Sequence, residues 1–173
     1  MLAAGRRLRL PVVSDREPCA AALVATLAVT VAALIRFLAA ENRPDAAHAY
    51  LVLFAGLFTV RVVAQIGVIA FRPAWLPPSG AWNFLPYRLL LPLQLILIAL
   101  IAAILTGRVA PGPGPARALV VLAVVYWAAM GVRYTLRMTR RPDQRWFGGA
   151  IPIVFHCVLA AFLFVLGVSH AAA

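Results

Sequence analysis

Five long apolar runs, separated by short polar segments, restrict this chain to a structure that uses a lipid bilayer as part of its solvent. The runs cover residues 19–40, 46–71, 86–107, 116–138 and 148–169. A helix needs about 20 apolar residues to cross a hydrocarbon core about 30 Å thick, and each run reaches that length. With 64% hydrophobic residues, a water-soluble domain of this size could not bury its apolar side chains. The sequence therefore predicts an all-α integral membrane protein, a single bundle of five transmembrane helices.

The polar segments between the runs predict the orientation of this bundle. All 16 basic residues are arginine, and the net charge is +11. If the N-terminus is cytoplasmic, ten arginines fall in cytoplasmic segments, three in outer segments and three within spans. Such an excess of arginine is typical of cytoplasmic loops. Five spans that start from a cytoplasmic N-terminus place the C-terminus outside. We expect the protein in a bacterial cytoplasmic membrane. The same distribution favours anionic lipid headgroups as partners of the loops and argues against nucleic acid.

The start of the chain allows two interpretations. In the first, residues 1–18 are a basic cytoplasmic segment, residues 19–170 form the five-helix domain, and residues 171–173 are a short tail. A basic start before an apolar run is also typical of a cleaved signal peptide. The first run is longer than the usual signal core, and no clear cleavage site follows it directly. We therefore expect an uncleaved first span.

Arg61 lies near the centre of the second apolar run, Ala46 to Phe71. A charge at this depth costs at least about 2.5 kcal/mol on insertion scales, so it usually faces protein or water and marks a functional site. None of the five acidic residues lies within an apolar run. We therefore expect the counter-charge of Arg61 to come from water, backbone carbonyls, a lipid phosphate, a ligand or another subunit.

Polar residues of the other runs fall at a similar predicted depth, in the cytoplasmic half of the bundle. On the fifth run, Pro152, His156 and Ala160 share one helical stripe, which predicts that His156 faces other helices rather than lipid. The candidate ligand-binding residues are Arg61, Gln65, Gln94, Tyr126, Arg133 and His156.

Each candidate also has a purely structural interpretation. The guanidinium group of Arg61 can form hydrogen bonds with water and backbone carbonyls, and the Gln94 amide can form an interhelical hydrogen bond. His156 can be a packing residue, while Arg133 can serve orientation and contact with anionic lipid. The sequence leaves these alternatives open.

The leading functional hypothesis is a non-catalytic membrane protein that binds an anionic amphiphile or a partner subunit through an Arg61-centred pocket. One alternative is a redox membrane enzyme or subunit that uses haem or quinone near His156, or near His48 and His170 at the outer level. Another is a structural or assembly subunit of a larger membrane complex. The sequence contains no Cys-x-x-Cys, no His-Glu-x-x-His and no glycine-rich phosphate loop at a helix start. We therefore predict no metal site, no catalytic residue and no cofactor outside the redox alternative.

Overall fold

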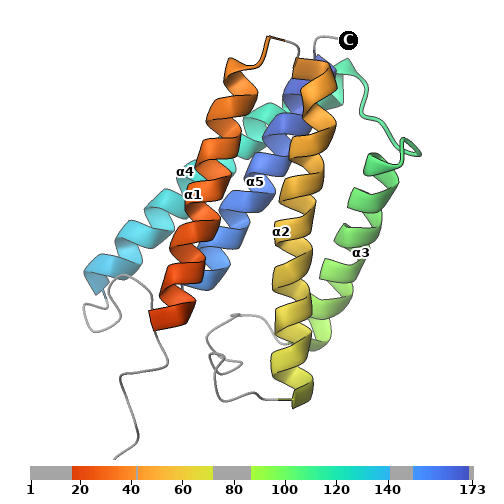
Figure 1. The fold of residues 1–173 in the computed structure, drawn as a ribbon. Coiled ribbons are helices and arrows are strands. Elements are labelled where there is room, and N and C mark those ends of the chain that lie inside the picture. Colours follow the sequence, from red (N-terminus) through yellow and green to blue (C-terminus); the bar gives the residue numbers. More distant parts are fainter. Residues whose placement is uncertain (1–16, 42, 72–86, 141–149, 172–173) are drawn as a thin grey trace, which may run out of the picture.

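The computed structural model describes residues 17–41, 43–71, 87–140 and 150–171, and nearly all of them are helical. The helices are α1 (Glu17–Ala39), α2 (Arg43–Phe71), α3 (Tyr87–Leu105), α4 (Pro113–Arg140) and α5 (Ala150–Ala171), shown in Figure 1. The predicted all-α class is confirmed. Four of these helices, α1, α2, α4 and α5, are long and apolar enough to cross a membrane. The apolar part of α3, Leu89–Leu105, is shorter.

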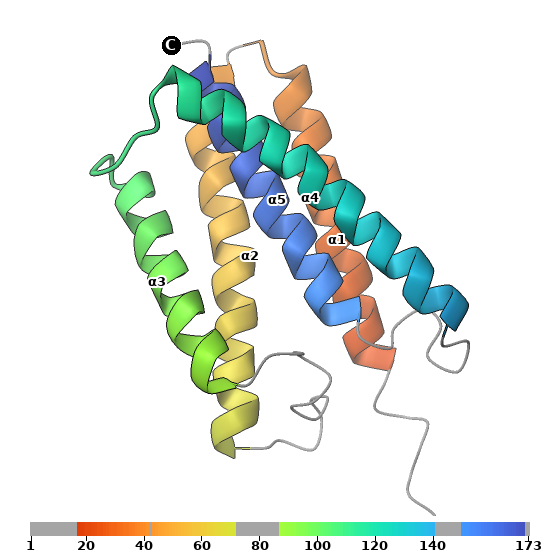
Figure 2. The ribbon, with the colours of Figure 1, turned by 180° about the vertical axis from the view of Figure 1, so that it is seen from behind.

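Successive helices alternate in direction along the bundle. The start of α1 and the end of α5 therefore lie at opposite ends of the molecule (Figure 1). The last helix, α5, is central, because it packs against α4, α2 and α1. By contrast, α3 packs mainly against α2 and stands at one side of the bundle (Figure 2).

Small and aliphatic side chains let α5 occupy this central position. Val158, Ala160, Ala161 and Val165 are fully buried, and such residues allow neighbouring helices to approach closely. At Gly167, a Cβ atom would lie only 2.7 Å from the carbonyl oxygen of Ala116. The glycine is therefore needed for the contact between α4 and α5.

Proline and glycine explain three of the differences between the helices and the predicted spans. The second and fourth spans were predicted to begin at residues 46 and 116, but α2 begins at Arg43 and α4 at Pro113. Pro44 and Pro113 fit in a first helical turn, where no backbone N–H donor is needed. The third helix ends at Leu105 instead of residue 107, because Gly107 adopts a φ of 72°. The Arg108 N–H then donates to the Ala103 carbonyl at 2.9 Å, which closes a Schellman motif.

The outer surface of α4 is apolar. Val121, Val125 and Val132 are each more than half exposed. A helix with this much exposed hydrocarbon requires an apolar surrounding, as expected for a face in contact with lipid.

Candidate functional site

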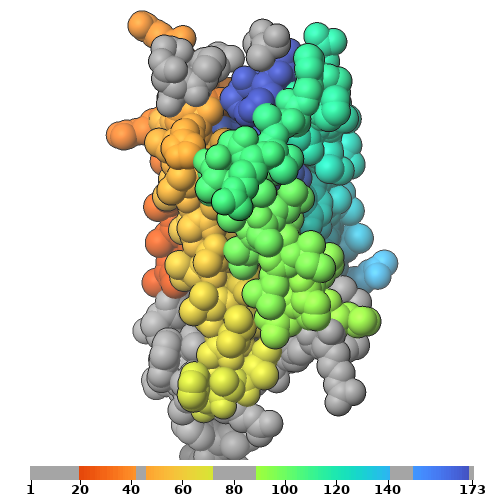
Figure 3. Space-filling model, turned by 90° about the vertical axis from the view of Figure 1, so that its right-hand side faces the viewer, coloured from red at the N-terminus to blue at the C-terminus, as the bar shows by residue number. Residues whose placement is uncertain are grey.

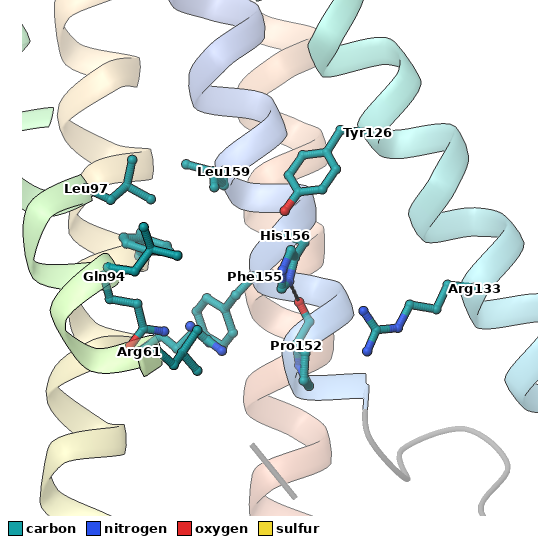
Figure 4. A pocket seen from close by; sticks show the side chains of 12 residues that line it. Arg61, Gln94, Leu97, Tyr126, Arg133, Pro152, Phe155, His156 and Leu159 are labelled. Carbon is teal, nitrogen blue, oxygen red and sulfur yellow. Dashed lines mark hydrogen bonds between the residues drawn. The ribbon is translucent and has the colours of Figure 1, made fainter. Parts of the chain in front are cut away.

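A cavity of about 290 Å³ lies between α2, α3, α4 and α5 (Figure 4). Five of the six candidate residues line it, and the sixth, Gln65, contacts one of those five. The remaining lining residues are apolar: Phe58, Leu90, Leu93, Leu97, Pro152, Phe155 and Leu159. No acidic residue occurs among these described lining residues. The structure thus brings the predicted polar layer together, while its role in ligand binding stays a prediction.

Arg61 extends from α2 toward α5 and is only 4% exposed. Its guanidinium carbon lies 5.6 Å from the centroid of the Phe155 ring. A cation over an aromatic face is attracted by the negative face of the ring. The expectation that Arg61 faces protein rather than lipid is confirmed.

Gln65 and Gln94 join α2 to α3 inside the bundle. Gln94 Nε2 donates to Gln65 Oε1 at 3.2 Å, and both side chains are buried. The interhelical hydrogen bond considered for Gln94 is therefore confirmed. Within the described part of the chain, Gln65 Nε2 and Gln94 Oε1 have no hydrogen-bond partner. The pair therefore keeps one donor and one acceptor for further interactions.

His156 is positioned by its own helix and by α4. Its Nδ1 atom is hydrogen-bonded to the carbonyl oxygen of Pro152, one turn earlier. Because a carbonyl oxygen can only accept, Nδ1 carries a proton, and Nε2 is an acceptor whenever the ring is neutral. The Tyr126 ring stands edge-on to the imidazole, with centroids 5.5 Å apart and an interplanar angle of 74°.

Arg133 reaches the cavity from the opposite side to Arg61. Its half-buried side chain extends from α4 toward Pro152 of α5 (Figure 4). Two guanidinium groups from different helices thus line the same cavity. Guanidinium groups bind carboxylates and phosphates with paired, charge-assisted hydrogen bonds. The cavity is therefore chemically suited to an anionic group.

The other two histidines lie outside this cavity. His48 is exposed near the start of α2, and His170 Nδ1 lies 3.1 Å from the Leu166 carbonyl oxygen near the end of α5. These helix ends lie at the same end of the bundle, as the predicted outer level implies. Among the described residues, no group of three or more His, Cys, Asp or Glu side chains could hold a metal ion.

Phe155 is a site residue that the sequence reasoning missed. Helical periodicity indicates which face of α5 it lies on, but not that Arg61 from another helix lies over its ring. Comparison with protein-family models, with curated proteins and with solved structures gave no match for this chain.

Proposed function

We propose that this chain is a non-catalytic, multi-pass membrane protein that binds an anionic amphiphile in the Arg61-centred cavity. The observation that carries the proposal is the convergence of Arg61 and Arg133, from α2 and α4, on one cavity that contains no acidic lining residue among those described. Charge-assisted hydrogen bonds to both arginines would hold the anionic group. Gln94, Tyr126 and His156 would orient it by further hydrogen bonds.

The size and lining of the cavity support an amphiphile rather than a small inorganic anion. Ligand pockets typically measure about 300–1,000 Å³, and this cavity, of about 290 Å³, lies just below the lower limit of that range. Leucine and phenylalanine make up half of its lining residues. A ligand that fills it would therefore combine one charged group with an apolar body.

We also propose five membrane spans, with the N-terminus in the cytoplasm and the cavity in the cytoplasmic half of the bundle. The alternating helix directions support this topology. The 19 residues of α3 extend about 28 Å at 1.5 Å per residue, close to the thickness of a hydrocarbon core. The proposed location is a bacterial cytoplasmic membrane, and the arginine distribution indicates which side of the bundle faces the cytoplasm.

The test is an inventory of what co-purifies with the protein in a mild detergent. Wild type, Arg61→Leu and Arg117→Leu are purified in parallel, and bound small molecules are identified by mass spectrometry. Arg117 is the matched control, because it is exposed and does not line this cavity. We expect an anionic amphiphile in wild type and in Arg117→Leu, and its loss in Arg61→Leu.

Other sets of co-purifying molecules would contradict the proposal. An identical set of bound molecules in all three proteins would exclude Arg61 as the anchor, and an empty wild-type protein would exclude a stable ligand. Bound haem or quinone would favour the redox alternative, and a co-purifying membrane protein would favour a subunit role. Circular dichroism of each variant shows whether the helical fold is intact.

A further inference from the structure

A second cavity, of about 220 Å³, lies next to the first one along α5. All of its described lining residues are apolar, and they come from the second half of α3, the α3–α4 connection, the start of α4 and the second half of α5. It carries no polar group that would hold water, because a buried water needs two or more polar partners. The space is therefore suited to hydrocarbon.

The two cavities meet at a shared boundary. Leu97 and Leu159 line both of them, and in Figure 4 these two side chains lie beyond Gln94 and His156 on the side away from Pro152. The second cavity therefore lies next to the site that Arg61 and Arg133 line, along the direction of α5. From His156 to Leu166, the length available along α5 is about 15 Å at 1.5 Å per residue.

The end of the second cavity away from the first is lined by the connection between α3 and α4. Val109 and Pro111, in the connection between α3 and α4, are part of its wall. Figure 3 shows α3 on the surface of the molecule between α2 and α4, so this wall of the cavity lies at the edge of the bundle.

We infer that the second cavity holds the hydrocarbon chain of the anionic ligand, with the charged group at Arg61 and the chain running along α5 toward its C-terminal end. The inference rests on the proposed function and adds the class of ligand, a long-chain carboxylate or long-chain phosphate. Either head group fits the guanidinium chemistry, and the experiment below distinguishes them.

Leu100 and Leu95 provide a matched pair of variants on α3. Leu100 lines the second cavity, whereas Leu95 lines neither cavity, and they are 47% and 51% exposed. Leu100→Trp should reduce the space for a chain, and Leu95→Trp should leave it unchanged. Both substitutions add the same aromatic group to the same helix, so a general effect on α3 would appear in both variants.

The experiment measures binding of octanoate, hexadecanoate, hexadecyl phosphate and hexadecanol to the detergent-purified protein by native mass spectrometry. We expect Leu100→Trp to weaken hexadecanoate binding about tenfold, because the larger side chain would exclude about two methylene groups of the bound chain from the second cavity. Octanoate binding should be unchanged. We expect Leu95→Trp to change neither. The better-bound of hexadecanoate and hexadecyl phosphate identifies the head group.

Each contrary outcome has a distinct meaning. If Leu100→Trp weakens both chain lengths equally, or neither, the second cavity does not hold the chain, while the proposed function still stands. If Arg61→Leu leaves the binding of every charged probe unchanged, or hexadecanol binds as well as hexadecanoate, the proposed function itself fails. Comparison of each variant with wild type in the same detergent cancels the partitioning of the probes into micelles.

Discussion

Gln94 Nε2 and Gln65 Oε1, 29 residues apart in the chain, are joined by a 3.2 Å hydrogen bond between α3 and α2. This contact matters because α3 packs mainly against α2. It also fixes one wall of the cavity, since Gln94 is a lining residue. The position of α3, and with it the shape of the site, depends partly on this amide pair.

We predict that Gln94→Leu lowers the free energy of unfolding by about 1–3 kcal/mol, because the buried Gln65 amide loses its only described partner. Gln65→Leu should have a similar effect. The double variant should be more stable than either single one, since removing both polar groups leaves none unsatisfied. Thermal unfolding followed by circular dichroism gives the double-mutant cycle. Additive losses would show that the two amides are not coupled.

We predict that Gly167→Ala weakens the packing of α4 on α5. The added Cβ would lie 2.7 Å from the Ala116 carbonyl oxygen and 2.7 Å from Val120 Cγ2, so the helices must move apart. Overpacking of this kind typically costs about 1–3 kcal/mol. Gly131→Ala is the matched control, because nothing lies within 4 Å of its Cβ position. Equal melting temperatures for the two variants would contradict the close contact.

We predict a graded effect of substitutions at Trp127. Its Nε1 donates to the Cys157 carbonyl oxygen at 3.1 Å, and its ring lies 5.5 Å from that of Phe164, both residues of α5. Trp127→Phe removes the hydrogen bond and should cost about 0.5–1.5 kcal/mol. Trp127→Ala also removes the ring contact and should cost about 3–5 kcal/mol. Denaturation of both variants in the same detergent measures the difference, and a larger loss for Trp127→Phe would contradict this order.

We predict that the two ends of the chain lie on opposite sides of the membrane. A reporter enzyme that is active only outside the cytoplasm should be active when fused after Ala173 and inactive when fused at the N-terminus. The physical reason is the excess of arginine in the segments assigned to the cytoplasm. Activity of both fusions, or of neither, would contradict five spans.

The helical class and the polar layer could be predicted from the sequence because both depend on local patterns. Apolar runs of spanning length require helices, and counting positions from the helix ends places Arg61, Gln94 and His156 at similar depths. The structure brings these three residues to one cavity. Their depth follows from helical rise, which varies little between helices.

The rest depends on contacts between helices that no local pattern encodes. The central role of α5 arises from the fit of Ala160, Ala161 and Gly167 against other helices, while residues of similar size elsewhere in the chain remain exposed. The cation–π contact between Arg61 and Phe155 requires a particular rotation of α2 against α5. Similarly, the direct bond between Gln65 and Gln94 depends on the register of α3, because a shift by one residue would turn Gln94 away.

The most direct test of the central claim is the affinity of one anionic probe, hexadecanoate, for wild type, Arg61→Lys, Arg61→Leu and Arg117→Leu. Hydrogen bonds to a charged group contribute about 1.5–3 kcal/mol, so Arg61→Leu should weaken binding by at least about tenfold. Arg61→Lys should fall between Arg61→Leu and wild type, because lysine keeps the charge but loses the planar pair of donors, and Arg117→Leu should match wild type. Binding to Arg61→Leu with unchanged affinity would contradict the Arg61-centred site.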